Sequence, residues 1–581
     1  MTLFIQRTII LAALALNPAV YGNTNGLFRE ITRDGITWRF DQPVQAGKFV
    51  SGDWWVVPNP GQDAVTVVSV EPAPTNTSVG KLINGSMVNP VPGYQAMDER
   101  GAVWKAEVGC HYPLVLKVNQ SLLSVRSVPE DDSKSKKTSN KTWVYEDEVL
   151  TCLAQPALAT DFRPPYVGAD KPLYSSLKLR RELLPDLAPP GKVEMPDMKA
   201  LTAARFSHPW MQFMIGYLNA QMAPVKYESS YGYNKSTEVG AAALLLCLDK
   251  KVVGDKDPLL IGLVQHGIDL YHTLTNGGNW QANGGFNSGR KFPILFAGLM
   301  LNNPAMLDIG TKYPLDSYTF AEDAQSFIIS QAEVDRKFLI TGQVLSAGPT
   351  TIGVGGKSAA EPDGVPPMNR FVSYRIKIIS GPGEGQVRMI SMSDAGFQAH
   401  PKPLITCTIE PPWGVLPEAH KSVYQILGFQ KEDIGKAWFC CPGYIAKVKW
   451  LSPVIIRGGL PGLGNPALAA DPTWEGAYSV LNRSSWPGMV LAARILGLKE
   501  VWKHEPLFQL EDEYMKETAP GGAYYGKEKF GTHRLSQLKP SNDPNDLQFT
   551  VGGAFTAAMW DLYRPQADQL GAEIAAKAKS P

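Results

Sequence analysis

The sequence predicts a multidomain α+β protein, in which an N-terminal β-sandwich precedes an α/α-toroid, a ring of helical hairpins, that a small β-module interrupts. Three observations predict this fold. The chain has 581 residues, enough for three or four domains. Its hydrophobic pattern changes from period two to helical spacing near residue 200, and the helical pattern stops between residues 339 and 413. The 54 glycines and 46 prolines, about 17% of the chain, indicate many turns and long connections.

Residues 1–22 have the pattern of a secretory signal peptide. Arg7 supplies the positive charge, residues 8–16 are apolar, and Val20-Tyr21-Gly22 places small residues at positions −3 and −1 of a cleavage site. The alternative is a membrane anchor, which needs roughly 20 apolar residues where this run has about nine. We therefore expect a secreted or periplasmic protein with no integral membrane segment.

Residues 23–155 are expected to form the β-sandwich. Short runs alternate with period two or are rich in β-branched residues, and turns rich in glycine, proline and asparagine separate them; the runs are 36–40, 54–57, 64–70, 122–128 and 143–153. The charged run 130–141 lies between the last two strands, which favours a hairpin loop over a domain linker. Residues 156–199 are rich in proline and are expected to form an extended connector.

Residues 200–338 are expected to form the first part of the toroid, with helices over 209–223, 237–248, 258–275, 293–301 and 320–338. Residues 339–413 predict a β insertion, with strands at 371–379 and 386–390 around a glycine-rich turn. Residues 414–565 form the second part of the toroid, with helices over 435–450, 488–498, 507–515 and 551–563, and 566–581 is a C-terminal tail. An insertion into one helical domain explains this order simply, because surface loops tolerate long insertions. Long loops between the helices favour a toroid over a four-helix bundle.

The charge balance narrows the class of partner. Fifty-six basic and 55 acidic residues leave a net charge of +1, so there is no general reason to expect a nucleic acid or an anionic membrane as partner. The chain also lacks the glycine-rich nucleotide motifs, the zinc-peptidase motif and the esterase motif, so no cofactor is expected.

Six cysteines are too few for a disulfide framework in a chain of this length, and their spacing is not that of a zinc site. Cys110 and Cys152 could form a disulfide within the first domain. The alternative is that the cysteines are small buried hydrophobic residues.

The stretch Asn276–Leu301 is the most informative for function. Two glycine pairs and Gly289 bracket polar residues just before an apolar helix, and glycines allow a backbone to approach a ligand closely. Amides, cations and a flat aromatic surface come from Asn279, Asn283, Asn287, Arg290, Lys291 and Trp280. An arginine beside amide groups predicts a clamp for a carboxylate. The alternative is an ordered loop in which Arg290 satisfies a carbonyl or an acid of the core.

Tyr231 and Tyr233 flank Gly232 just before a predicted helix, in whose first turn Glu238 lies. A phenol with a pKa near 10 is a poor base in water, but a neighbouring Arg or Lys favours its anion, so that it can take or give a proton. The alternative is that both tyrosines are aromatic residues at a rim, with hydrogen-bonded hydroxyls.

Further candidates lie elsewhere in the helical part. Glu322 and Asp323 head a predicted helix, where acids are ordinary partners of the helix dipole, although one of them could position a base. His208, before a Pro-Trp pair, and His533, in a loop, are the candidate histidines, and each alone is more often structural. Tyr525 follows a glycine pair in another loop.

Four segments resemble a known group of proteins: GDWWVV (52–57), INGSMVNP (83–90), FRPPYVG (162–168) and GGNWQANGGFNSGRKFPILFAG (277–298). The chain resembles secreted bacterial proteins with an N-terminal β domain and an α/α-toroid, the layout of several polysaccharide lyase families, alginate and glucuronan lyases among them. The resemblance spans most of residues 27–565. Such relatives often carry histidine where this chain has Phe286, so either that histidine is not essential or this protein has lost some activity.

The resemblance implies β-elimination on an acidic polysaccharide. Arg290 with Asn279 or Asn283 would neutralise the C6 carboxylate, as charge is stabilised in an oxyanion hole. Tyr231 or Tyr233 would act as base and acid, with His208 or His533 as the fallback base. Further substrate contacts would come from Trp280, Asn287, Lys291, Glu238, Glu322 and Tyr525. No metal is required when arginine and asparagine neutralise the carboxylate. The polymer and the oligomeric state stay open.

Two other functions remain open. A glycoside hydrolase on the same toroid would use two carboxylates, such as Glu238 and Asp323. A non-catalytic glycan-binding or cell-surface protein would bind through its β domains.

Overall fold

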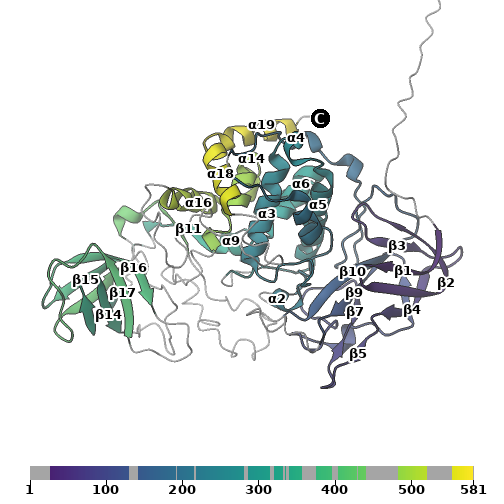
Figure 1. Cartoon of the computed structure of the whole chain (residues 1–581), viewed down its shortest axis with the longest axis horizontal. Helices are drawn as coiled ribbons and strands as arrows, with labels where there is room; N and C mark the ends of the chain where they lie inside the picture. The colour runs from purple at the N-terminus through teal and green to yellow at the C-terminus, as the bar shows by residue number, and fades with distance from the viewer. Residues whose placement is uncertain are drawn as a thin grey trace, which may run out of the picture.

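The computed structural model describes residues 26–129, 142–191, 193–214, 218–280, 285–314, 319–331, 334, 339–355, 375–394, 404–427, 430–439, 482–519 and 553–579. The protein is a mixed α+β chain. Figure 1 shows an eight-stranded sheet at one end, a seven-stranded sheet at the other and most of the helices between them. The predicted signal peptide lies outside the described residues.

The N-terminal sheet has the strand order β7-β9-β10-β3-β2-β4-β8, with β1 paired to β2. Its strands are β1 (Gly26–Arg33), β2 (Ile36–Lys48), β3 (Trp54–Val57), β4 (Ala64–Glu71), β7 (Ser86–Val88), β8 (Leu114–Lys117), β9 (Gln120–Ser127) and β10 (Val144–Cys152), and the short β5 (Thr75–Asn76) and β6 (Leu82–Ile83) pair separately. All five predicted strand runs fall on these elements. β9 and β10 pair antiparallel from Ser127 opposite Val144, which confirms that the run 130–141 joins a hairpin, although the loop itself lies outside the described residues.

Of the two possibilities for Cys110 and Cys152, the disulfide does not form. Both thiols are free, and Cys152 is fully buried in the apolar core of the N-terminal sheet, among residues such as Trp38 and Leu150. Burial raises the pKa of each thiol to about 12. Cys247 and Cys407 are also free and buried, so these four cysteines behave as small hydrophobic residues.

The longer helices lie where the apolar periodicity predicts them. They are α3 (Gly232–Cys247), α5 (Asp257–Thr275), α6 (Lys291–Leu301), α14 (Pro487–Ile495), α16 (Glu505–Thr518) and α18 (Gly553–Tyr563). The expected C-terminal tail is instead helix α19 (Ala567–Lys579), which packs against α14 through Gly571 and Ile574. Shorter helical segments are α1 (Met198–Leu201), η5 (Thr202–Phe206), α2 (Asn219–Met222), α4 (Lys250–Val253), α7 (Pro304–Leu307), α8 (Ile309–Lys312), α9 (Ala321–Ala324) and α15 (Lys499–Trp502).

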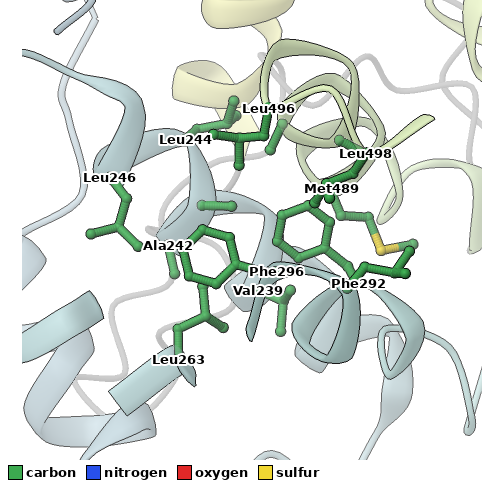
Figure 2. Close-up of a cluster of buried hydrophobic side chains, with 14 of the residues drawn as sticks. Val239, Ala242, Leu244, Leu246, Leu263, Phe292, Phe296, Met489, Leu496 and Leu498 are labelled. Carbon is green, nitrogen blue, oxygen red and sulfur yellow. The ribbon is translucent and has the colours of Figure 1, made fainter. Parts of the chain in front are cut away.

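Helices α3, α5, α6 and α14 share one apolar core, part of which is drawn in Figure 2. Val239 of α3, Leu263 of α5, Phe296 of α6 and Met489 of α14 are fully buried there. Nearly every residue of α3 and α6 is buried, which explains why residues 239–247 of α3 and 292–301 of α6 are apolar on all sides rather than along one stripe.

Gly240 allows α3 and α14 to pack closely. A Cβ at this position would lie 2.7 Å from the backbone nitrogen of Met489 and 2.9 Å from Gly488, and a backbone cannot move aside as a side chain can. We therefore expect Gly240→Ala to lower the free energy of unfolding by about 1–3 kcal/mol, measured by urea denaturation. Gly191→Ala is the matched control, because its Cβ would meet no atom within 4 Å. Equal stabilities of the two variants would contradict this account.

Two helix predictions are wrong because tertiary contacts override the pattern. In the predicted helix 209–223 only α2 is helical among the described residues, and the backbone N–H of Met211 donates to the Glu228 carboxylate at 2.7 Å. Met211 and Phe213 instead pack in a core shared with Met87 and Leu123 of the N-terminal sheet. An apolar run of this kind fits an extended segment between two cores as well as a helix.

The second wrong prediction concerns residues 320–338. The helix ends with α9 at Ala324, and β11 (Ser326–Ile328) follows and pairs antiparallel with β19 (Ala437–Phe439). β19 itself lies at the start of the helix predicted over 435–450, whose remainder falls outside the described residues.

The seven-stranded sheet stands between helical segments of the chain, where the break in the helical pattern predicts it. Its strands are β12 (Leu339–Gln343), β13 (Ser346–Gly348), β14 (Thr351–Gly355), β15 (Arg375–Ser380), β16 (Val387–Asp394), β17 (Leu404–Glu410) and β18 (Val423–Leu427). They surround a separate core that includes Ile376, Ile409 and Trp413. The sheet extends to Leu427, beyond the expected end at residue 413, because β18 pairs between β12 and β15.

Among the helices described, none combines the length and the apolar character that crossing a bilayer requires.

Candidate functional site

Helix α3 packs against the segment that precedes α6 at its own start, and against the start of α14 further along at Gly240. Tyr231 immediately precedes α3, Arg290 precedes α6 and Trp486 precedes α14. The backbone N–H of Tyr233 donates to the Gly285 carbonyl at 2.8 Å, which holds the segment 285–290 against the start of α3. We call this region the helix-end site; its residues are Tyr231, Tyr233, Gly285, Phe286, Arg290, Gln325 and Asn482.

A tyrosine hydroxyl, a glycine backbone and an amide meet in this site. A Cβ built on Gly285 would lie 2.6 Å from the Tyr231 hydroxyl and 3.0 Å from Oδ1 of Asn482. The Tyr231 ring contacts the Phe286 ring edge-on, with centroids 4.7 Å apart, and Nδ2 of Asn482 donates to Oε1 of Gln325 at 3.1 Å. The glycine-rich sequence makes these approaches possible.

Gly232 and Gly289 explain why the segment 285–290 can lie against helix α3. A Cβ on Gly232 would lie 2.2 Å from the Phe286 carbonyl oxygen. Gly289 has a positive φ of 90°, a conformation that other residues rarely adopt, and Ser236 and Ser288 share a hydrogen bond of 2.8 Å beside it. The close backbone approach that these glycines allow is therefore approach to α3, and approach to a ligand stays a prediction.

Arg290 does not face solvent, which corrects its predicted role as a carboxylate clamp. The residue is 1% exposed, and its guanidinium donates to Oε1 of Gln212 at 2.9 Å, to the Phe286 carbonyl at 3.1 Å and to the Ser288 carbonyl. Burial lowers its pKa to about 10, so it remains a cation at neutral pH. This is the alternative in which the guanidinium satisfies core carbonyls, and it fixes Phe286 against Tyr231.

Tyr233 lies in a second group of polar residues beside the site. Burial raises the pKa of Tyr233, and a hydrogen bond with Ser484 only partly opposes that effect. The expected stabilisation of its phenolate by a neighbouring cation is therefore not found. Nearby, burial also raises the pKa of Tyr514 and of Glu511, whose carboxylate is fully buried.

Three other predicted contact residues are in the interior. Trp280 is fully buried and stacks on Phe320 at 6.0 Å, so its face is not available to a sugar. Lys291 is 1% exposed, pairs with Asp323 and donates to the Trp502 carbonyl at 2.7 Å. Glu238 is buried and accepts from Arg205 at 2.8 Å. The carboxylates considered for a hydrolase, Glu238 and Asp323, thus belong to separate buried ion pairs.

The predicted amides and loop residues are placed as follows. Asn287 is buried, and Asn279 is half-buried with an Oδ1 atom that accepts no hydrogen bond within the described part of the chain. Asn283, Tyr525 and His533 lie outside the described residues.

Glu322 caps the start of α6 and gives a pH-dependent prediction. Its Oε1 accepts from the backbone N–H of Lys291 at 3.3 Å, and burial together with the Asp323 charge raises its pKa from 4.5 to about 7. Since the folded state holds this proton more tightly, the stabilisation is complete below pH 4.5 and is lost as the pH rises through 7. We expect Glu322→Gln to remove this dependence and to be more stable than the natural chain at pH 8, by about 1–3 kcal/mol in urea denaturation. Parallel pH profiles for the two proteins between pH 5 and pH 8 would contradict it.

His208 lies apart from the helix-end site, where the N-terminal sheet meets the helices. Its Nε2 is 2.8 Å from Oδ2 of Asp34 and 3.3 Å from Oε1 of Glu148, and its ring stacks on Tyr227 with centroids 3.4 Å apart. Burial alone lowers its pKa, but the interactions with both carboxylates outweigh this and raise it. Since both carboxylates face the nitrogen that would take a proton from a substrate, the structure gives little support to His208 as the fallback base.

His208 borders a cavity of about 150 Å³ at this junction. Asp53, Arg163, Gln265 and His266 also line it. Burial lowers the pKa of His266 to about 3, so this imidazole is neutral at ordinary pH and donates from Nε2 to the His208 carbonyl at 2.8 Å.

Sequence reasoning missed Asn482 and Gln325 in the helix-end site, and Asp34 and Glu148 beside His208. Their spacing along the chain carries no signal, because each comes from a different element. Only Asp34 carried a local sequence signal, because an Asp-Gly pair is typical of a tight turn. In the structure Asp34 lies in the turn between β1 and β2 and has a positive φ of 48°.

The chain matches no protein-family profile, no curated protein and no solved structure.

Proposed function

We propose that the protein is a secreted carbohydrate-active enzyme that cleaves a uronic-acid-containing polysaccharide by β-elimination. One observation carries this proposal. The Tyr231 hydroxyl lies against the Gly285 backbone and near the Asn482 amide, at the start of α3 and beside the segment that buried Arg290 holds through the Phe286 carbonyl. The short apolar run near the N-terminus supports secretion, and the buried helices α3, α5, α6 and α14 support an α/α-toroid beside a β-sandwich.

The charge environment suits a carboxylate. Helix α3 has 16 residues, and its N-terminus carries a partial positive charge that favours a nearby anion. The buried guanidinium of Arg290, the last residue of the segment 285–290, adds a full positive charge. In this proposal amides such as Asn279 and Asn283 contact the C6 carboxylate, and Arg290 is a positioning residue.

Tyr231 performs the proton transfers in the proposed mechanism. Neutralising the carboxylate makes the C5 proton acidic, and the Tyr231 oxygen removes it. The electron pair of the C5–H bond forms the C4–C5 double bond as the C4–O4 bond breaks, and the departing O4 takes a proton from the same phenol. Tyr233 supports this site through its backbone bond to Gly285.

The test is an assay of the mature protein on a panel of uronate polymers that includes alginate and glucuronan. We expect a rise in the ultraviolet absorbance of a 4,5-unsaturated uronate on at least one polymer. New reducing ends without that absorbance would replace the proposal with hydrolysis, and binding without either product would replace it with a glycan-binding role.

A further inference from the structure

Three side chains of types that can bind metals, Asp34, Glu148 and His208, converge outside the helix-end site. Oδ2 of Asp34, Oε1 of Glu148 and Nε2 of His208 all lie within 4.8 Å of one another. Each comes from a separate element: the turn between β1 and β2, strand β10, and the segment after η5. The group therefore forms only when the N-terminal sheet and the helical part come together.

Each of these three side chains is held in place through its other polar atom. Nδ1 of His208 is 2.7 Å from the Ser207 hydroxyl, Oδ1 of Asp34 accepts from Lys226 at 3.1 Å, and Oε2 of Glu148 lies 3.2 Å from Nε of Arg33. Outer partners of this kind orient the ligands of metal sites. Lys226 and Arg33 also pair with Glu146 and Asp53, so neither cation belongs to the three side chains alone.

Glu148 supplies an independent observation. Its side chain is fully buried, and Oε1 accepts no hydrogen bond of acceptable geometry within the described residues. The single hydrogen on Nε2 of His208 can serve only one of the two carboxylates, and Asp34 is the nearer at 2.8 Å. Two carboxylate oxygens thus share one imidazole N–H, an arrangement that a positive charge stabilises, whether it comes from a protonated imidazole or from a bound cation.

We propose that Asp34, Glu148 and His208 bind a divalent transition-metal ion, with zinc as the expected ion. One imidazole nitrogen and two carboxylate oxygens are ligands that zinc accepts, and three protein ligands leave a fourth position for water. Ligand atoms in a tetrahedral zinc site are roughly 3.4 Å apart. Oε1 of Glu148, 3.3 Å from Nε2, already has this separation, whereas Oδ2 of Asp34, 2.8 Å from Nε2, must move away from the nitrogen to reach it. The Asp34 side chain is 32% exposed, so an ion can enter from solvent.

The proposal does not depend on the enzymatic function, and its test measures metal binding alone. The mature protein is treated with a chelator, dialysed and titrated with zinc chloride by calorimetry, and the bound metal is then counted by elemental analysis. We expect one zinc per chain at this cluster. Asp34→Asn and His208→Ala should each weaken binding at least about tenfold. His111→Ala, which changes an exposed histidine of the same domain, should bind as the natural chain does.

Two results would overturn the proposal: no zinc uptake by the natural chain, or equal affinity in Asp34→Asn. Because Asp34 lies in a surface turn and keeps its size as asparagine, this variant answers the question even if His208→Ala fails to fold.

Discussion

Tyr231→Phe is expected to lower the rate of unsaturated uronate formation by about 10²–10⁴-fold, the range over which a positioned acid or base contributes to catalysis. The substitution removes only the hydroxyl that lies against Gly285. The ring keeps its edge contact with Phe286, so the segment 285–290 should stay in place and the protein should stay folded. The measurement is the initial rate on the polymer that the panel identifies, with circular dichroism spectra and unfolding midpoints compared in parallel.

Tyr145→Phe is the matched control, because Tyr145 is a half-buried tyrosine on β10 whose ring stacks beneath Arg126. It should retain full activity. If Tyr231→Phe also retained it, Tyr231 would have no part in the chemistry, and Tyr233→Phe would then test the second phenol. Loss of activity together with loss of folding in Tyr231→Phe would argue for a structural role instead.

Arg163→Ala is expected to lower the free energy of unfolding by about 3–5 kcal/mol. Arg163 is fully buried, donates to Asp53 at 3.0 Å, and holds both oxygens of Asp269 at 3.0 and 2.5 Å. Burial disfavours the charge, but the two carboxylates raise the pKa of the guanidinium and keep it ionised. Removing it would leave buried Asp269 without the cation that pairs with it, and buried Asp53 with Arg33 alone, where the N-terminal sheet meets α5.

Urea denaturation of the full chain measures this effect. Arg181→Ala is the matched control, since Arg181 pairs with Asp257 where the side chains are 37% and 46% exposed, and it should cost less than about 1 kcal/mol. Replacing Arg163, Asp53 and Asp269 together with apolar residues should recover much of the loss, because no buried charge then stays unpaired. A small effect of Arg163→Ala alone would show that water reaches this junction.

The sequence predicts the long helices and the strands well, and the reason is visible in the cores. Helices such as α5 and α6 bury almost every residue, and a continuous apolar run of that length has few other solutions. The prediction fails at Met211 and Phe213, which are equally apolar but fill a core shared with the N-terminal sheet. Local pattern cannot tell which neighbour an apolar run will meet.

The candidate site was predicted in part. The glycine-rich run and Tyr231 do come together, because glycines at 232, 285 and 289 allow backbones to touch. Arg290 and Trp280 were expected to face a ligand and are buried, since a large side chain next to an apolar helix can also complete the core. Their residue types suit both roles, and only burial separates them.

The amino-acid order alone settles which stretches become helix or strand, and where the backbone can bend tightly. Pairing across long distances in the chain is decided by tertiary structure, as Asp34, Glu148 and His208 show: they are far apart in sequence, yet their polar atoms face one point. Side-chain periodicity is a local property of the backbone, whereas the meeting of charges depends on how separate cores pack, and packing depends on the whole chain at once.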